Sequence, residues 1–457
     1  MGNSFCVIVL AAGEGTRMKS SYPKVLHLLH NKPMLSYVIK KAEKLKPEKI
    51  IIVVNKKNHI EVEKMYSNKK SLEFVVQGSQ LGTADAVNAA RDVAIKYANC
   101  MILYGDVPLI SIETLKNVKK LHFQRNADMT IATTYLDDPH PYGRVKRDTS
   151  GKVIKIIEEA DATEEEKKIK EINVGIYCCK TKLLFKFLPQ LTPSTRKGEY
   201  YLTDLVEKFS LLGHKVESYV IKNTDEIIGI NSRIELAVAE KILSQSVLKK
   251  MMSSGVTIID PDNTYIEEVA KIAPDSTIYP GTIIRGKTVI GKNCHIGPYT
   301  YIENCVIGDN TKIEFSYICG ARVGNNVTIG PFARIRPTTH VENNVRIGSF
   351  AELKNTKVLA CSKIPHHSYV GDSFIGRNVN IGAGAITCNF DGKSKHRTII
   401  GDDVFVGSNV NFIAPVRVGK GAVIAAGSTI TEDVPPYSLA IARERQVTKV
   451  DYYKNKK

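Results

Sequence analysis

The sequence predicts two domains, an α/β domain of the Rossmann-like type followed by a parallel β-helix built from hexapeptide repeats. Its 457 residues exceed what one ordinary hydrophobic core organises, so two domains are expected. The first part holds continuous apolar runs such as residues 5–12, which are typical of strands buried on both faces of a sheet. In the second part an aliphatic residue returns at every sixth position from about residue 272 to residue 430. A period of six fits neither a helix nor a sheet crossed by helices, and it is typical of hexapeptide β-helices.

Composition narrows the classes of partner. The net charge of +17 invites a nucleic-acid hypothesis, but the lysines are scattered, Trp is absent and no basic-aromatic motif occurs. We therefore expect small polyanionic substrates and no nucleic acid. The nine cysteines show no Cys-x-x-Cys spacing, which favours buried thiols in a reducing compartment. No apolar run approaches the roughly 18 residues of a membrane span, so no membrane partner and a cytoplasmic location are expected.

The first strand pattern is followed by a glycine turn, residues 13–18, and then by Pro23-Lys24. Such a turn exposes backbone N–H groups to a phosphate, and Arg17 and Lys24 add positive charge. The spacing is that of neither a Walker A loop nor a dinucleotide fingerprint. Residues 10–18 with Pro23-Lys24 resemble the signature of sugar-phosphate nucleotidyltransferases. The resemblance implies that a nucleoside triphosphate is held by Leu10, Ala11, Ala12, Gly13, Arg17 and Lys24.

Two further strands are expected at residues 49–55 and 72–77, and a helix is expected to open near Thr83 and run through Ala94. The resemblance assigns Gln77, Gly82 and Thr83 to the uracil ring. A Thr83 side chain that only caps the helix is the alternative. The choice of uridine over thymidine or guanosine as the nucleoside rests on this resemblance alone.

Another buried strand ends at Tyr104-Gly105-Asp106. Ligands of open α/β sheets lie beyond the carboxyl ends of strands, and a carboxylate there suits Mg²⁺. The resemblance assigns Tyr104 and Gly105 to substrate, Asp106 to the metal, and Asn231 to both. A helix cap is the alternative role for Asp106.

The segments around Gly143, Glu158 and Asn173 resemble those that contact the amino sugar, although Glu158 and Glu159 could exchange roles. The nucleotidyltransferase domain is expected to cover residues 1–231. Apolar residues at helical spacing then predict a linker helix over residues 232–254, and the β-helix domain is expected to cover residues 255–457.

Within each hexapeptide coil, three short strands should point aliphatic residues inward, with Gly or Asn at corners that need φ > 0. The repeats resemble the left-handed β-helix of hexapeptide acyltransferases, which trimerises and binds its acyl carrier between two prisms. The six-residue rhythm departs twice, at residues 363–372 and at residues 387–398, and the second segment should loop outward. A purely structural solenoid is the alternative.

The polar residues in and around these two segments resemble those of the hexapeptide enzymes that acetylate glucosamine 1-phosphate. The resemblance makes His366 the base that takes the amine's proton, with His367 as its rival. It assigns Arg336 and Lys354 to the sugar's phosphate. The other sugar ligands it implies are Tyr369, Asn380, Asn389 and Phe390, and the acetyl-CoA ligands are Ala383, Ser408, Ala426 and Arg443. Phe390 stands where that family usually has Tyr, which removes a hydroxyl and leaves stacking intact.

Together the two signatures resemble the bifunctional UDP-N-acetylglucosamine pyrophosphorylases that are also glucosamine-1-phosphate N-acetyltransferases. The resemblance implies an α/β nucleotidyltransferase domain followed by a left-handed parallel β-helix, assembled as a homotrimer. It implies Mg²⁺, acetyl-CoA as co-substrate, and the substrates UTP, glucosamine 1-phosphate and N-acetylglucosamine 1-phosphate. The product would supply peptidoglycan and lipopolysaccharide synthesis and so cell shape. Two alternatives are a monofunctional nucleotidyltransferase whose β-helix only assembles the oligomer, and a non-catalytic regulatory subunit.

Overall fold

In the computed structural model, which describes residues 4–194 and 198–454, the first predicted strand is β1 (Phe5–Leu10), with all six residues buried. It pairs in parallel with β4 (Lys49–Asn55) and β6 (Asn99–Tyr104), and β4 pairs in parallel with β5 (Leu72–Gln77). The expectation of parallel strands buried on both faces is therefore confirmed. The sheet continues in the order β11-β7-β10-β6-β1-β4-β5.

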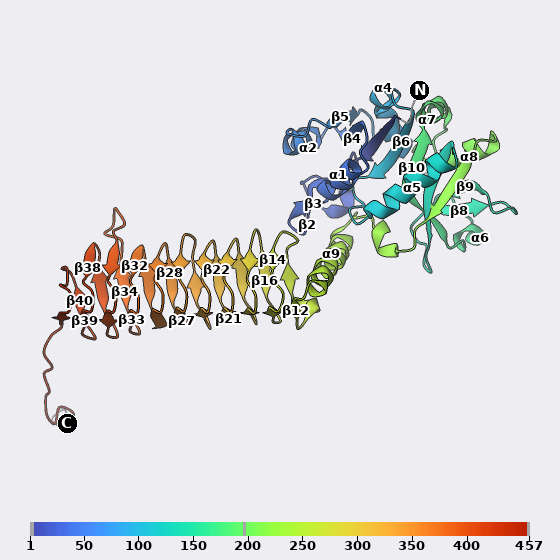
Figure 1. Ribbon diagram of the computed structural model, residues 1–457. Coiled ribbons are helices and arrows are strands. Elements are labelled where there is room, and N and C mark those ends of the chain that lie inside the picture. Colours follow the sequence, from blue (N-terminus) through green and yellow to red (C-terminus); the bar gives the residue numbers. More distant parts are fainter. Residues whose placement is uncertain (1–3, 195–197, 455–457) are drawn as a thin grey trace. The chain divides into compact units, whose positions relative to one another are not determined.

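Within this seven-strand order, one strand runs against the others. β10 (Glu171–Lys180) lies antiparallel to both β6 and β7 (Met129–Tyr135), and β11 (Val216–Val220) pairs in parallel with β7. The pair β8 (Arg144–Arg147) and β9 (Val153–Ile157) joins the edge of β10. Helices cover both faces of the sheet (Figure 1). They are α1 (Met34–Lys44), α2 (His59–Tyr66), α3 (Thr83–Ala89), α4 (Arg91–Ala94), α5 (Ile112–Gln124), α6 (Glu164–Lys167), α7 (Thr181–Phe187) and α8 (Asp204–Leu211).

The alternation of side chains along β1 divides the core of this unit. Val7 and Val9 pack with α1 and α5, whereas Cys6 and Ile8 pack with α3, α7 and α8. Six of the cysteines are buried, but Cys361 is exposed and two others are partly exposed, so the expectation of buried thiols is wrong for these three.

The chain divides into two units, Met1–Leu243 and Ser244–Lys457, and the boundary falls inside α9 (Arg233–Ser253). Ala239 packs in the first unit against Leu29, Met34 and Ile230. Leu248, about two and a half turns further on, belongs to the core of the second unit. None of the helices in the described ranges is long and apolar enough to cross a membrane. The functional bounds 1–231 and 255–457 stay a prediction.

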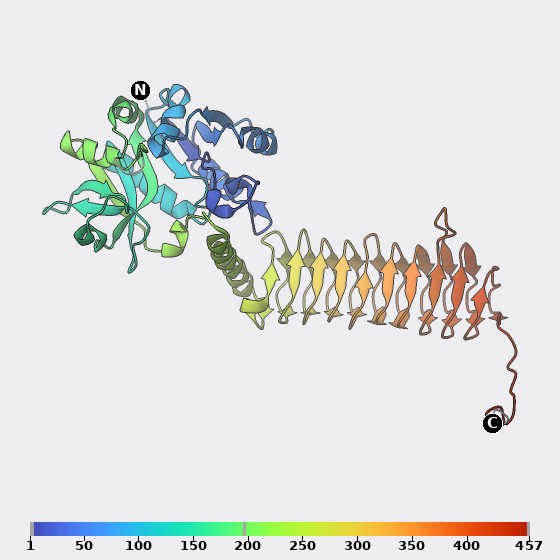
Figure 2. The same cartoon turned by 180° about the vertical axis from the view of Figure 1, so that it is seen from behind.

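The second unit is a column of short parallel strands in three sheets that begin at β12 (Thr257–Ile258), β13 (Tyr265–Ile266) and β14 (Lys271–Ile272). From β12 to β40 (Thr429–Ile430), each strand that pairs with a later one pairs with the strand three further along, except that β39 (Val423–Ile424) pairs with β41 (Leu439–Ala440). Three strands therefore make one coil (Figures 1 and 2). This is the predicted left-handed parallel β-helix of hexapeptide repeats. The coils around the predicted acetyl site contain β27 (Arg346–Ser349), β28 (Glu352–Lys354), β30 (Lys363–His366), β31 (Tyr369–Gly371), β32 (Ser373–Ile375), β33 (Asn380–Ile381), β34 (Ile386–Cys388), β35 (Thr398–Ile400), β36 (Phe405–Val406) and β39 (Val423–Ile424).

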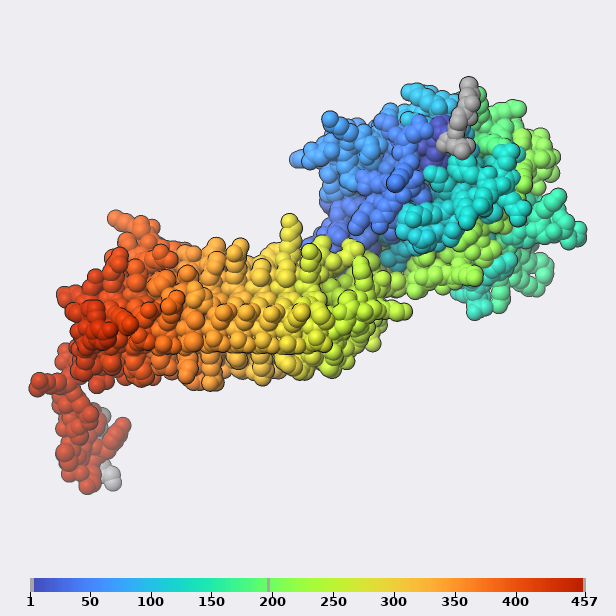
Figure 3. All heavy atoms as spheres, in the orientation of Figure 1, coloured from blue at the N-terminus to red at the C-terminus, as the bar shows by residue number. Residues whose placement is uncertain are grey.

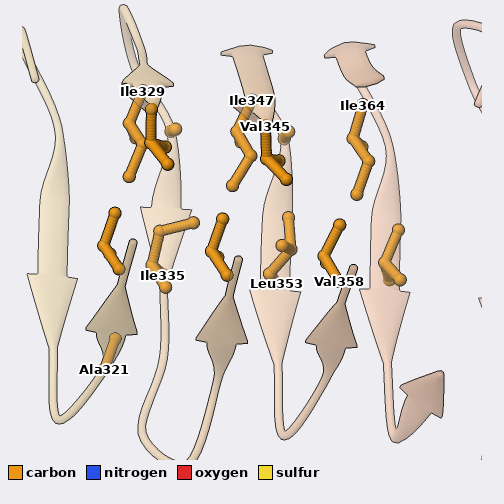
Figure 4. Packing of buried hydrophobic residues seen from close by; sticks show 14 of the residues in the cluster. Ala321, Ile329, Ile335, Val345, Ile347, Leu353, Val358 and Ile364 are labelled. Atoms are coloured by element: carbon orange, nitrogen blue, oxygen red, sulfur yellow. The ribbon is translucent and has the colours of Figure 1, made fainter. Parts of the chain in front are cut away.

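The interior of the column is a set of aliphatic ladders. Ile329, Ile347 and Ile364 follow one another in register on one sheet, and Ile335 and Leu353 do so on the next. All five are fully buried and point into the column (Figure 4). Burial of each aliphatic side chain contributes about 1.5–3 kcal/mol, so the repeat supplies the core coil by coil.

The corners follow the prediction only in part. One corner is filled mostly by Asn with positive φ, at residues such as Asn293, Asn310 and Asn326. The next corner carries aromatic residues with positive φ instead, and the rings of Phe332 and Phe350 stack at 5.4 Å. The expectation that Gly or Asn fills these corners is therefore incomplete.

The two segments that interrupt the six-residue repeat differ in how they affect the column. Residues 363–372 keep the ladder intact, since Ile364 and Val370 stay buried and in register. At the second departure Ile375 pairs with Ile400 across 25 residues, whereas Val358 pairs with Ile375 across 17. The additional residues form an outward hairpin closed by the bridge between Phe390 and Lys395, which projects from the surface of its unit (Figures 2 and 3).

Candidate active sites

The predicted nucleotide loop borders a cavity of about 400 Å³ beyond the carboxyl ends of β1 and β6. Its lining includes most of the residues assigned to the nucleotide, namely Leu10, Ala11, Ala12, Gly13, Lys24, Gln77, Gly82 and Thr83. It also includes Tyr104, which was assigned to substrate, and Asp106, which was assigned to the metal. A larger cavity of about 870 Å³, bordered by Asn99 and Lys180, holds none of them. The residues predicted to bind the nucleotide therefore line the smaller of these two cavities, which is the candidate nucleotide site. Arg17 is exposed and is not brought to this lining.

Side-chain amides fix the peptide planes of the loop. Asn58 Nδ2 donates to the carbonyl of Ala11 at 2.9 Å, and Asn55 Nδ2 donates to that of Ala12 at 2.7 Å. Gln80 Nε2 also donates to Ala12 O, at 3.0 Å. In a trans peptide the N–H of the next residue points opposite to the carbonyl. The N–H groups that follow these carbonyls are therefore directed away from the amides, as phosphate binding requires.

Glycine is needed where the loop crosses Lys24. Gly15 has φ +68, and a Cβ there would lie 2.6 Å from Cβ of Lys24. The close approach lets the Lys24 ammonium reach Asp106 Oδ2 at 2.5 Å and Asn231 Oδ1 at 3.1 Å. Lys24 is buried and the Asp106 side chain is 16% exposed, so the three groups share a largely desolvated site.

The backbone holds the two oxygen ligands together. Ile230 N donates to Asp106 O at 2.8 Å, and Glu235 accepts from the backbone N–H of Asn231 at 2.7 Å. A carboxylate and an amide oxygen thus converge on one cation, the Lys24 ammonium. Hard oxygen donors of this kind suit Mg²⁺, so the residues present fit the expected metal.

The base end of the cavity shows how Gly82 and Thr83 are used. Gly82 is the N-cap of α3 with φ +115, and a Cβ there would lie 2.5 Å from Tyr200 O. Thr83 Oγ1 accepts from Leu202 N at 3.0 Å and does not cap the helix, so the capping alternative is wrong. The single helix through Ala94 is also wrong, because α3 stops at Ala89 and α4 follows.

The predicted sugar ligands lie around Tyr104. Its ring packs on Gly175, and burial, with Glu158 and Asp106 nearby, raises its pKa. Glu158 accepts from Thr203 Oγ1 at 2.8 Å and lies next to Gly143.

The neighbouring Glu159 is used differently, since it pairs with the buried Arg144 at 2.6 Å. The geometry therefore separates the two glutamates and leaves Glu158 on the side of Tyr104. Asn173 donates to Tyr177 at 2.7 Å and accepts from Gly175 N at 3.1 Å, so its amide is held in one orientation.

On the column, the predicted phosphate ligands form a cationic group. Arg336 and Lys354 lie at the ends of neighbouring strands of one sheet, and Arg336 bonds to Glu352 at 3.0 Å. The pKa of Lys354 is lowered, first by its contact with Lys395 of the hairpin and then by Arg336. Gly371 continues the Lys354 position on the next coil, and the Tyr369 ring lies over it.

The predicted base and acetyl-CoA residues share one edge of the column. Left-handed corner residues stack on successive coils at His367, Gly384, Asn409 and Gly427. The residues that precede them are His366, Ala383, Ser408 and Ala426. Arg443 donates to Ala426 O at 2.6 Å, which extends the same edge. The structure therefore lines up the predicted base, His366, with the four residues that the resemblance assigns to acetyl-CoA.

The remaining sugar ligands lie on both sides of this edge. Asn380 is on the outer face of the sheet that contains Lys363, away from Arg336 and Lys354. Asn389 is buried and donates to Asp372 at 2.5 Å at the base of the hairpin. Phe390 is 59% exposed. One chain thus presents its predicted acetyl-site residues on two faces that meet at the His366 edge.

Comparisons with known proteins cover both units. Residues 6–255 match the nucleotidyl transferase family, and residues 261–339 and 318–418 match the family described as the GMPPB C-terminal domain. The bifunctional protein GlmU of Caldanaerobacter subterraneus subsp. tengcongensis is 48% identical over 97% of this chain and 96% of its own. Those of Carboxydothermus hydrogenoformans and Bacillus subtilis are each 46% identical over 98% of this chain, covering 99% and 98% of their own. The chain belongs to the GlmU family.

Several residues that shape the sites of this GlmU-family chain were not singled out from the sequence. They are Asn55 and Asn58, which hold the loop, Asp85, which bonds to Gln77, and Lys395, which lies beside Lys354. Asn55 ends a predicted strand, which was a usable signal under the rule for open sheets. The others act through contacts that local sequence does not encode.

Proposed function

We propose that this GlmU-family chain catalyses two consecutive reactions of UDP-N-acetylglucosamine synthesis. It acetylates glucosamine 1-phosphate with acetyl-CoA, and it transfers uridylyl from UTP to the resulting N-acetylglucosamine 1-phosphate. The proposal rests on the presence of two sets of predicted site residues in one chain. In the first unit Lys24, Asp106 and Asn231 converge, and in the second unit the predicted base and acetyl-CoA residues line the His366 edge. UTP and acetyl-CoA are cytoplasmic metabolites, so we place both reactions there.

In the uridylyl transfer, a phosphate oxygen of the sugar attacks the α-phosphorus of UTP and pyrophosphate leaves. The loop at Ala12 and Gly13 would orient the triphosphate through backbone N–H groups, and Lys24 would offset its charge. Mg²⁺ held by Asp106 and Asn231 would supply further positive charge against the phosphates. Tyr104, Gly143, Glu158 and Asn173 would position the sugar. Arg17, exposed here, would act on phosphate only if the loop closes over it.

In the acetyl transfer, the 2-amino group attacks the thioester carbonyl, His366 takes the amine's proton, and CoA leaves as the thiol. Arg336 and Lys354 would bind the sugar's phosphate, with Lys395 adding a third positive charge. Ala383, Ser408, Ala426 and Arg443 would line the path of the acyl carrier.

We also propose that the second unit works as a homotrimer. A ligand site is normally concave, whereas the His366 edge is convex and carries its polar residues on two faces. A neighbouring copy would close the site by laying one face against that edge. Light scattering gives the subunit number, and mixing His366→Ala with Arg336→Ala chains tests the sharing, because recovered acetyl transfer requires a site built from two copies.

One assay tests both activities. The purified chain is given glucosamine 1-phosphate, acetyl-CoA, UTP and Mg²⁺, and free thiol and pyrophosphate are followed together. Release of both supports the proposal. If no thiol is released, a second sample is given N-acetylglucosamine 1-phosphate, UTP and Mg²⁺. Pyrophosphate release from that sample alone supports the alternative in which the column only assembles the oligomer.

A further inference from the structure

Asp85 lies behind the base end of the nucleotide cavity and holds Gln77. Gln77 is 4% exposed and lines the cavity at the end of β5, whereas Asp85 lies in the first turn of α3 and does not line it. Gln77 Nε2 donates to Asp85 Oδ2 at 2.7 Å and to Gly82 O at 3.4 Å. Asp85 can therefore influence a ligand only through Gln77.

This contact decides which end of the Gln77 amide faces the cavity. An amide can be turned so that either its oxygen or its nitrogen occupies a given place, and the hydrogen-bond partners must settle which. An ionised carboxylate only accepts hydrogen bonds, so the nitrogen must point to Asp85. The carbonyl oxygen Oε1 is then turned the other way, and no partner for it is found among the described residues.

We propose that Asp85 is a positioning residue that sets the choice of base, by fixing the Gln77 carbonyl as an acceptor toward the cavity. This inference rests on the proposed uridylyl transfer. Uracil presents an N3–H donor to such an acceptor. Cytosine presents an unprotonated N3 at the same place, which would face Gln77 Oε1 with two acceptors and no hydrogen. The contact with Asp85 therefore selects UTP over CTP.

The size of the effect follows from the cost of unpaired groups. A site built to hydrogen-bond one substrate group rejects an analogue that lacks it, because a buried polar atom is left without a partner. We expect a preference for UTP over CTP, in kcat/KM, of at least about a hundredfold in the unaltered chain. Without Asp85 the amide can turn its NH₂ to the cavity, and the preference should fall at least about tenfold.

The test measures pyrophosphate release from UTP and from CTP with N-acetylglucosamine 1-phosphate. Asp85→Asn keeps the size of the side chain but offers Gln77 either a donor or an acceptor, so both orientations of Gln77 become possible. Asp85→Ala removes the partner altogether and should relax the ratio in the same direction. Asp92→Asn, which removes an exposed carboxylate of the following helix, is the matched control and should leave the ratio unchanged.

The outcomes are distinguishable. A ratio that falls in both Asp85 variants and is kept in Asp92→Asn supports the inference. A ratio that is unchanged in the Asp85 variants overturns it, even if their rates drop, because a merely structural role lowers both rates alike. If the unaltered chain releases no pyrophosphate from either nucleotide, the proposed function itself fails, and this inference fails with it.

Discussion

The ammonium of Lys24 lies 2.5 Å from Asp106 Oδ2, in a site where both side chains are mostly withdrawn from water. Removal of one partner of such a pair leaves an uncompensated charge, which is strongly destabilising. The second acceptor, Asn231 Oδ1 at 3.1 Å, shows that the pair also gathers the oxygens proposed for the metal. The pair therefore connects folding of the loop with the uridylyl reaction.

We expect Asp106→Asn to lower uridylyl transfer by at least about a hundredfold, because the charge at the phosphates is then poorly balanced. The variant should also need more Mg²⁺ to reach half of its maximal rate. Thiol release by the same preparation should be unchanged, since the proposed acetyl site lies in the other unit. A normal Mg²⁺ requirement in Asp106→Asn would contradict the assignment of this carboxylate to the metal.

The converse prediction concerns His366. His366→Ala should lower acetyl transfer by about a hundredfold to ten-thousandfold, the usual contribution of a general base. Uridylyl transfer to supplied N-acetylglucosamine 1-phosphate should stay normal. His367→Ala is the matched control, because His367 occupies the corner with φ 38 one residue further on. A larger loss in His367→Ala than in His366→Ala would assign the proton transfer to the rival base.

A pH dependence follows from the cationic group. The pKa of Lys354 is lowered by Lys395 and Arg336, since neighbouring positive charges disfavour its protonated form. The proposed acetyl site should bind its product, N-acetylglucosamine 1-phosphate, through the same phosphate contacts. Its affinity for this product should therefore weaken as pH rises through the lowered pKa of Lys354.

Replacement of Lys395 gives the sharper form of this test. Lys395→Gln should weaken binding about tenfold at neutral pH, and it should move the alkaline loss of affinity to higher pH, because the pKa of Lys354 rises when the largest cause of its lowering is removed. Calorimetric binding across pH 7–10 measures both effects. Lys393→Gln serves as the control on the same hairpin, and an equal displacement in that variant would argue against the specific contact.

Asp204 predicts a pH dependence of stability. Burial, followed by the charges of Glu158, Glu207 and Asp161, raises its pKa to about 6. A carboxyl group whose pKa is higher in the folded state stabilises the fold below its unfolded pKa, and this contribution is lost as pH rises through about 6. Asp204→Asn should therefore melt at a higher temperature than the unaltered chain at pH 8, and the difference should shrink by pH 4.5. Equal differences at the two pH values, measured by calorimetry, would refute the assignment.

The column could be predicted in detail because one rule repeats. Each inward position, such as Ile347 or Ile364, obeys the same period, so errors in one coil are corrected by the next. The exception was the corner with aromatic residues. Phe332 and Phe350 adopt a backbone conformation that such side chains rarely take, and no local propensity predicts that choice.

The first unit was predicted less completely. The continuous apolar runs gave the strands, but the reversal of β10 depends on how its ends connect, which hydropathy does not record. The site residues recognised from motifs lie close to one another within each motif, although the motifs themselves are far apart along the chain. Asp85 was missed although it is only eight residues from Gln77, because its role depends on an amide orientation that no motif expresses.

The hairpin at Phe390 and Lys395 also shows how a repeat acquires chemistry. Ile375 finds Ile400 in the ordinary register even though 25 residues separate them, so the enlarged corner leaves the ladder beneath it undisturbed. The length of a corner is therefore independent of the strand pairing beneath it. A corner can be lengthened, shortened or exchanged while every neighbouring coil keeps its partners. Such a column is a scaffold on which evolution or protein engineers can exchange the ligand-binding loops at the corners.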